Sequence, residues 1–236
     1  MLRIEHLTKN FGDTCAVKDL SLHIRPGEIY GFIGHNGAGK TTTLRCVTGL
    51  LRFDGGEILV DGIPVKKDPL ECKRRFAYLP DNPDIYDFMK GIEYLNFIGD
   101  IFAVPAEARR ERIRKYGDAF GLTDDLAQPV SAYSHGMKQK LALISALIHE
   151  PKLLIMDEPF VGLDPVAAHQ LKQYMRGICD AGGAIFFSTH VLDVAEKLCD
   201  KVAIIRKGEL IRSGTMEEVR NNASLESVFL ELEDAK

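Results

Sequence analysis

The hydrophobic and polar positions divide the chain into three stretches. The first, residues 1–82, consists of short apolar runs separated by turns. Within it, Leu20–Ile24 alternates apolar and polar residues, as a half-buried antiparallel strand does. The middle stretch, residues 83–150, changes character and favours helices, which we expect over these ranges: 90–102, 105–120 and 138–149.

The third stretch, residues 151–215, returns to strands. Three solid apolar runs are typical of parallel strands that are covered on both faces, and they occupy residues 153–156, 184–187 and 202–205. Helices are expected in the gaps between these runs, and such alternation predicts an α/β core with a mostly parallel sheet. We therefore predict one domain with N-terminal antiparallel strands, an inserted helical subdomain and a C-terminal tail from residue 216 to 236, in which an amphipathic helix is expected.

Composition narrows the class of protein. The chain has 236 residues, 45% of them hydrophobic, and a net charge of −4. This balance gives no basic footprint, so we expect no nucleic-acid partner. The start of the chain lacks the layout of a signal peptide, and no stretch approaches the roughly 18 uninterrupted apolar residues of a membrane span. We expect a cytoplasmic protein, and any membrane-spanning part of its machinery must come from another chain.

A glycine-rich loop follows the first buried strand and precedes a helix. It matches the phosphate-loop pattern, in which the backbone N–H groups of the loop surround phosphate oxygens. Lys40 is expected to place its charge on the β- and γ-phosphates, and the Thr41 hydroxyl to bind Mg²⁺. The residues expected to bind nucleotide in this region are Gly34, His35, Asn36, Gly37, Ala38, Gly39, Lys40, Thr41 and Thr42.

Two carboxylates stand at the end of a second buried strand. Asp157 and Glu158 follow the apolar run 153–156, and His190 ends the run that begins at residue 184. Ligands of open α/β sheets bind beyond the carboxyl ends of the strands, so these groups should lie beside the phosphate loop. Asp157 suits holding Mg²⁺, Glu158 accepting a proton from the attacking water, and His190 contacting the γ-phosphate or that water.

Together these motifs resemble the nucleotide-binding domain of ATP-binding-cassette (ABC) transporters over nearly the whole chain, and the likeness is greatest to bacterial exporter-type subunits. The resemblance implies a P-loop NTPase (RecA-like) core from residues 1–82 and 151–215, with residues 83–150 as the helical subdomain. It identifies the phosphate loop as Walker A and the strand ending in Asp157 as Walker B. It also implies that Phe11 stacks on adenine, although a core phenylalanine is the alternative.

A signature-like motif precedes the third predicted helix of the middle stretch. In Tyr133–Met137, Ser134 and Gly136 match the family's usual Leu-Ser-Gly-Gly-Gln, whereas the other three positions depart from it. The resemblance implies that Ser134 and Gly136 meet the γ-phosphate of a nucleotide held by a second subunit. Taken alone, Ser134 would be a helix N-cap.

Asp81 stands where the family usually has the glutamine of its Q-loop. The resemblance makes Asp81 a candidate ligand of Mg²⁺, together with Thr41 and Asp157. An aspartate adds negative charge near a triphosphate, which should weaken direct coordination unless a cation screens it. Coupling through this position is therefore in question, while nucleotide binding is not.

The resemblance also implies partners. One is a second ABC subunit, identical or different, and the other is an integral membrane permease that would hold this chain at the inner face of the cell membrane. Tyr86 and Phe88 are candidates for a socket that receives a helix of the permease, with core packing as the alternative.

The predicted activity is ATP hydrolysis with Mg²⁺ in an exporter. One alternative is a soluble ATPase acting on a ribosome, DNA or an assembly partner. The other is a non-hydrolysing nucleotide-gated module.

Overall fold

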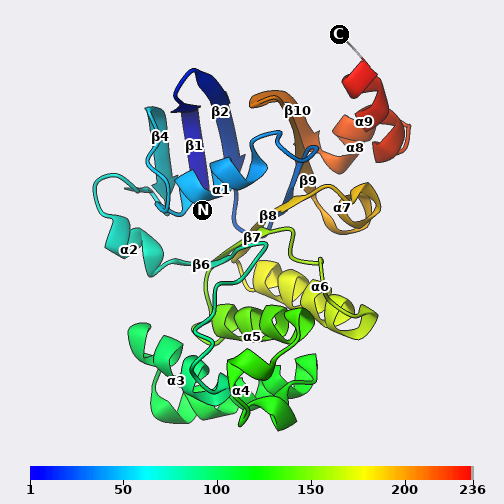
Figure 1. Ribbon diagram of the computed structural model, residues 1–236. Coiled ribbons are helices and arrows are strands. Elements are labelled where there is room, and N and C mark those ends of the chain that lie inside the picture. The colour runs from blue at the N-terminus through cyan, green and yellow to red at the C-terminus, as the bar shows by residue number, and fades with distance from the viewer. Residues whose placement is uncertain (235–236) are drawn as a thin grey trace.

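The computed structural model describes residues 1–234, and its strands form two sheets (Figure 1). Four antiparallel strands form one sheet in the order β2-β1-β4-β5, and six strands form the other in the order β10-β9-β3-β8-β7-β6. The strands are β1 (Leu2–Phe11), β2 (Thr14–Ile24), β3 (Ile29–Ile33), β4 (Gly55–Val60), β5 (Ile63–Pro64), β6 (Phe76–Leu79), β7 (Leu153–Asp157), β8 (Ala184–Thr189), β9 (Lys201–Arg206) and β10 (Glu209–Thr215).

The helices lie on both sides of the six-stranded sheet. In Figure 1, α3, α4 and α5 form a separate lobe below it, while α1 lies on the side of the antiparallel sheet. The helices are α1 (Lys40–Val47), α2 (Pro69–Lys73), α3 (Gly91–Ile101), α4 (Ala106–Phe120), α5 (His135–Leu147), α6 (Pro165–Asp180), α7 (Leu192–Leu198), α8 (Met216–Arg220) and α9 (Leu225–Asp234). No helix within residues 1–234 is long and apolar enough to cross a membrane.

The six-stranded sheet is parallel from β9 to β6, and only its edge strand β10 runs antiparallel. This arrangement confirms the predicted α/β fold with a mostly parallel sheet, N-terminal antiparallel strands and an inserted helical subdomain. The sheet places the carboxyl ends of β3, β7 and β8 side by side, because these strands are parallel and adjacent in the order β3-β8-β7.

Two hydrophobic cores lie on the two faces of this sheet. In β3, Ile29 and Ile33 belong to the core shared with the helical lobe. Tyr30 and Phe32 point the other way, into the core shared with the antiparallel sheet and α1. Strands β7, β8 and β9 divide their side chains in the same manner. Burial on both faces explains the solid apolar runs in the sequence, and each large side chain so buried stabilises the fold by about 1.5–3 kcal/mol.

The structure corrects one helix boundary. The helix predicted from residue 138 begins at His135, because the Ser134 Oγ accepts a hydrogen bond from the Met137 N–H at 3.3 Å and caps it. The amphipathic helix expected in the tail is present as α9, and a short helix, α8, precedes it; residues 235–236 lie outside the described part of the chain.

Candidate nucleotide-binding site

The phosphate loop connects β3 to α1 and requires glycine for steric reasons. Gly39 has φ 106°, a left-handed conformation that L side chains rarely adopt. A Cβ at this position would lie 2.5 Å from the Ala16 carbonyl oxygen, so a side chain would not fit. The loop therefore passes close under the β1–β2 hairpin, and its shape depends on glycine at this position.

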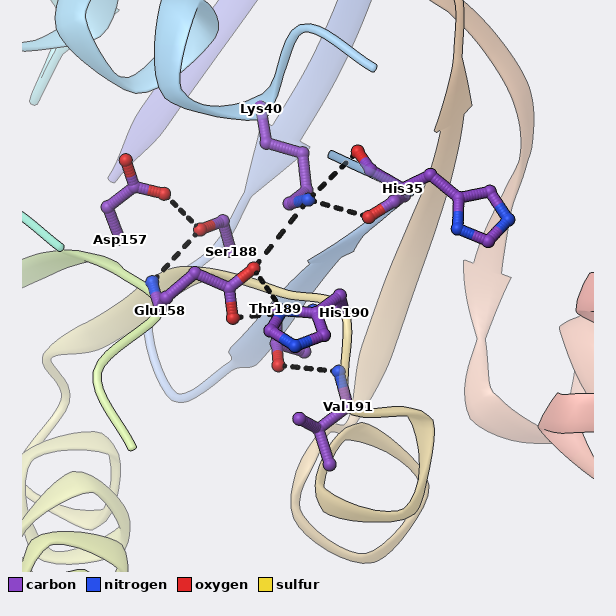
Figure 2. A network of polar contacts seen from close by, with 9 residues as sticks. His35, Lys40, Asp157, Glu158, Ser188, Thr189, His190 and Val191 are labelled. Atoms are coloured by element: carbon purple, nitrogen blue, oxygen red, sulfur yellow. Dashed lines mark hydrogen bonds and ion pairs between the residues drawn. The ribbon is translucent and has the colours of Figure 1, made fainter. Parts of the chain in front are cut away.

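Lys40 points back into the loop. Its Nζ donates hydrogen bonds to the carbonyl oxygens of Gly34 at 2.6 Å and His35 at 3.2 Å, as Figure 2 shows. The same Nζ lies 3.6 Å from Glu158 Oε1, and the Lys40 side chain is only 6% exposed. Burial lowers the pKa of Lys40, and the neighbouring carboxylates of Glu158 and Asp157 oppose that shift. The ammonium group is thus held at the loop, where an anion would stabilise it further.

Asp157 is a fully buried carboxyl group at the end of β7. Its Oδ1 accepts a hydrogen bond from the Ser188 hydroxyl, while its Oδ2 has no hydrogen-bond partner among the described residues. Burial raises the pKa of Asp157, and the hydrogen bond from Ser188 and the nearby Thr41 hydroxyl act in the opposite direction. A buried carboxylate with an open oxygen next to a hydroxyl is a donor set that fits a hard cation such as Mg²⁺.

This cation would need ligands from outside the protein. No group of three His, Cys, Asp or Glu residues in the described chain is arranged to hold a metal ion. Mg²⁺ commonly binds through one or two protein oxygens, with water and substrate phosphates as the remaining ligands. Thr41 and Asp157 fit that pattern. Asp81 lines the same pocket, but it is exposed and its Oδ1 accepts a hydrogen bond from the Asn82 N–H at 2.9 Å.

Glu158 adopts an unusual backbone conformation directly after β7. Its φ of 47° lies in the left-handed region, which is uncommon for residues other than glycine. The Glu158 N–H donates hydrogen bonds to two oxygens of Ser188, the hydroxyl at 3.1 Å and the carbonyl at 3.2 Å. Such strain persists where the surroundings impose it, and it is often found at active sites. Here it turns the carboxylate towards the phosphate loop (Figure 2).

His190 adjoins this carboxylate. Its Nδ1 lies 2.9 Å from Glu158 Oε1, and its backbone N–H donates to Glu158 Oε2 at 3.4 Å. The side chain of Glu158 is 15% exposed, whereas that of His190 is 48% exposed. Glu158 is therefore held between an imidazole and the Lys40 ammonium group, with His190 on the solvent side.

One pocket collects most of the predicted site. It is lined by Ala16, His35, Asn36, Gly37, Gly39, Lys40, Thr41, Thr42, Asp81, Asp157 and Glu158. Phe11 is outside this lining, is 51% exposed, and has the Lys9 Nζ 5.0 Å from its ring centroid. The alternative of a core phenylalanine is therefore wrong, and the ring is accessible for stacking.

The signature-like residues lie elsewhere. Ser134 caps α5, and neither Ser134 nor Gly136 lines the pocket of its own chain. A Cβ on Gly136 would lie 2.9 Å from the Gly162 carbonyl oxygen, so the start of α5 packs closely on the loop before α6. Lys140 Nζ, 2.6 Å from Asp164 Oδ2, further fixes this loop to α5. The Ser134 surface is exposed and faces no phosphate site of the same chain.

Two contributors to the site escaped the sequence analysis. Ser188 holds both Asp157 and the backbone of Glu158, and Ala16 lines the pocket from the neighbouring hairpin. Asp157 and Ser188 are register partners in the β7–β8 pairing. The signal for Ser188 was a hydroxyl near the end of an apolar strand, but its partner depends on a strand register that the sequence does not reveal.

The fold and this pocket define a P-loop nucleotide-binding protein. Residues 17–161 match the ABC transporter family, and the chain belongs to that family. It is 38% identical over 206 residues to the uncharacterized ABC transporter ATP-binding protein all4389 of Nostoc, covering 86% of this chain and 61% of that one. It is 34% identical over 242 residues to the ABC-type transporter ATP-binding protein EcsA of Bacillus subtilis, covering 100% of this chain and 98% of EcsA.

Solved structures agree with this assignment. The structure of an ATP-binding subunit of an ABC transporter superposes with a TM-score of 0.95 at 32% identity, covering 99% of this chain and 100% of that one. A dimeric ATP-binding cassette bound to ADP and phosphate shares the fold at 21% identity, with a TM-score of 0.83 and coverage of 92% and 99%. The chain spans about three fifths of the length of two curated cyanobacterial relatives that it matches.

Proposed function

We propose that this chain binds ATP with Mg²⁺, hydrolyses it at a site shared between two subunits, and thereby drives an exporter whose membrane-spanning part is a separate chain. One observation carries the proposal: the Glu158 carboxylate lies 2.9 Å from His190 Nδ1 and 3.6 Å from Lys40 Nζ, in a pocket formed by the phosphate loop. Hydrolysis requires a base, a cationic group and a phosphate site in one place.

Nucleotide binding would use groups that the pocket already brings together. The loop N–H groups and Lys40 would bind phosphate oxygens, and Phe11 would stack on the adenine ring. Phosphate oxygens would compete for the Lys40 ammonium group with the carbonyl oxygens of Gly34 and His35. Thr41 and Asp157 Oδ2, which has no partner among the described residues, would hold Mg²⁺, and the cation would neutralise charge on the phosphates. Asp81 remains a weaker candidate ligand.

In hydrolysis, Glu158 orients the attacking water and accepts its proton. His190 Nδ1 lies against the carboxylate, and its half-exposed ring would be available to contact the γ-phosphate. The hydrogen bonds from the Glu158 N–H to Ser188 fix the carboxylate in this direction. General-base catalysis of this kind typically contributes about 10²- to 10⁴-fold in rate.

A second subunit would complete the site. The N-terminus of α5, with Ser134 as its cap, presents N–H groups and a partial positive charge on an exposed surface. That surface is outside the pocket of its own chain, so we infer that it covers a nucleotide bound by a partner subunit. Either an identical or a different ABC subunit would serve, since this chain contains both halves of the composite site.

An exposed aromatic cluster is the proposed contact with the membrane chain. Tyr86 is 50% and Phe88 84% exposed, which rules out the alternative that they pack in the core. Tyr86 is in ring contact with Phe88, Tyr94 and Phe97. A groove next to Tyr94 separates the core from the helical lobe and is lined by Thr48, Leu50, Lys73, Phe76, Ala77, Tyr78, Tyr94, Ile98, Phe102, Ser145, Ala146 and His149. We propose that an apolar cytoplasmic helix of the permease docks along this cluster and groove.

The test is purification of the tagged chain from its native membranes in mild detergent. We expect a stoichiometric integral membrane chain to co-purify with it, together with ATP hydrolysis that depends on Glu158. Recovery with ribosomes, nucleic acid or soluble factors, and no integral chain, would favour the soluble ATPase instead. The likeness of Tyr133–Met137 to exporter-type signatures supports export as the direction of transport.

A further inference from the structure

The C-terminal helix α9 contacts the phosphate loop. The rings of His35 and Phe229 meet edge to face, with centroids 4.8 Å apart and planes inclined by 66°. His35 lines the nucleotide pocket, whereas Phe229 is only 5% exposed and belongs to the hydrophobic core. A segment almost two hundred positions away in the sequence therefore meets the second residue of the loop.

Helix α9 is anchored firmly enough to act as a fixed support. Leu225 and Val228 are buried in the same core as Phe229. At one end of the helix, the Leu225 N–H donates to Glu196 Oε2 of α7 at 2.9 Å. At the other end, the Arg206 guanidinium at the end of β9 donates to the Leu232 carbonyl oxygen. Helix α9 is thus anchored both before and after Phe229, which fixes the position of the Phe229 ring.

The same helix also reaches the segment that follows His190. Strand β8 ends at Thr189, His190 follows, and α7 begins at Leu192 and carries Glu196. Helix α9 therefore contacts the phosphate loop, through Phe229, and α7, the helix that follows His190, through Leu225.

We propose that Phe229 is a positioning residue for the phosphate loop: through its edge-to-face contact with His35, α9 holds the start of the loop in its nucleotide-binding shape. The inference rests on the proposed nucleotide binding at this loop. The loop binds phosphate through its backbone N–H groups. The apparent nucleotide affinity is therefore proportional to the fraction of chains in which the loop keeps that shape. The energy of one aromatic pair corresponds to about a two- to twelve-fold change in an equilibrium.

The test compares nucleotide affinity among variants of the full chain. Phe229→Leu keeps an apolar side chain in the core but removes the ring. Val228→Ala, a substitution of a buried neighbour on the same helix, serves as the matched control for general loosening of α9. Binding of a fluorescent ATP analogue with Mg²⁺ is titrated, hydrolysis is measured over a range of ATP concentrations, and thermal melting checks that each variant is folded.

We expect Phe229→Leu to raise the dissociation constant and KM by up to about twelve-fold and to leave kcat unchanged, because Glu158 is not moved. Val228→Ala should lower the melting temperature without changing the affinity. In a His35→Ala background, Phe229→Leu should have no further effect on affinity, since the contact is already absent.

Wild-type affinity in Phe229→Leu, an equal loss in Val228→Ala, or a full additional loss in the His35→Ala background would overturn the inference and leave the proposed function intact. A wild-type chain that bound no nucleotide would overturn the proposed function and this inference with it.

Discussion

The pocket at the phosphate loop and the groove beside the helical lobe are built in opposite ways. In the pocket, charged groups are buried and held: Asp157 by Ser188, and Lys40 by two loop carbonyls and Glu158. In the aromatic cluster beside the groove, apolar rings are exposed, as at Tyr86 and Phe88. Fixed polar groups suit one small charged ligand, whereas exposed apolar groups suit a protein surface. Under the proposed function, chemistry and coupling would therefore be carried by different kinds of surface.

The two regions also differ in buried charge. The buried Asp157 carboxylate has a raised pKa and an oxygen without a partner among the described residues, so a bound cation would stabilise its charged form. The exposed rings of the aromatic cluster carry no such buried charge. Loss of a polar group in the pocket should therefore alter chemistry, whereas loss of a ring at the groove should alter only the response to a partner.

The largest effect is expected at Glu158. Glu158→Gln keeps the size of the side chain but removes the base, so ATP hydrolysis should fall by about 10²- to 10⁴-fold while nucleotide binding is retained. Phosphate release and nucleotide titration measure the two properties separately. The exposed Glu57→Gln on β4 serves as control and should behave as wild type. Hydrolysis near the wild-type rate in Glu158→Gln would show that the base lies elsewhere.

A second prediction concerns His149, which lines the groove. Its ring stacks on that of Phe102 with the two ring centroids 3.7 Å apart, and burial lowers the pKa of His149 to about 4. Between pH 6.5 and about 4 the unfolded chain protonates this imidazole and the folded chain does not, so acid lowers the free energy of unfolding. The loss of unfolding free energy should be on the order of 1–3 kcal/mol. Above pH 6.5 the imidazole is neutral in both the folded and the unfolded chain, so this loss is absent.

Urea unfolding at pH 7.5 and pH 5 measures this difference. His149→Phe keeps a flat ring against Phe102 and should lose less stability on acidification than the wild type. An identical pH dependence in both proteins would mean that His149 is protonated as easily in the folded chain as in the unfolded one.

A third prediction is that Asp157→Asn changes binding and stability in opposite directions. The amide oxygen still accepts from the Ser188 hydroxyl, but the buried charge is gone, so the nucleotide-free chain should gain on the order of 1 kcal/mol, about 2–4 °C in Tm. The enhancement of nucleotide binding by Mg²⁺ should be lost. Thermal melting without Mg²⁺ and titrations with and without it test both effects. Retained Mg²⁺ dependence would remove Asp157 from the cation site.

The smallest effect in isolation is expected at Phe88. Phe88→Ser replaces a ring that is 84% exposed, so the free energy of unfolding should change by less than about 0.5 kcal/mol and basal ATP hydrolysis should stay the same. Co-purification with the membrane chain should nevertheless weaken. Leu230→Ser, at a position that is 56% exposed on α9, is the control and should leave that association intact. Unchanged co-purification of the membrane chain with Phe88→Ser would contradict the proposed contact.

The parts of the fold that the sequence revealed are those with a strong local pattern. Strands β7, β8 and β9 are buried on both faces and therefore appear as solid apolar runs. The phosphate loop is a contiguous pattern in which the requirement for Gly39 is local and steric. Because the parallel arrangement brings strand ends together, the neighbourhood of Lys40 and Glu158 also followed from the sequence.

Features that depend on tertiary contacts were missed. Strand β10 has no fully buried residue and hence no apolar pattern. The hydrogen bond from Ser188 to Asp157 depends on the register between β7 and β8. The contact of His35 with Phe229 joins two residues that lie far apart in the sequence, and it depends on where α9 packs. The catalytic and ligand-binding roles assigned to the site residues remain predictions for the experiments above.

The shared active site is tested most directly by measuring the mass of the Glu158→Gln chain by sedimentation with and without ATP and Mg²⁺. We expect a single chain without nucleotide and a dimer with it. Adding Ser134→Asp should abolish the dimer, because aspartate keeps the cap of α5 but would place a negative charge against the γ-phosphate. A chain that stays monomeric with ATP bound, or a dimer that forms equally well with Ser134→Asp, would overturn the proposed composite site.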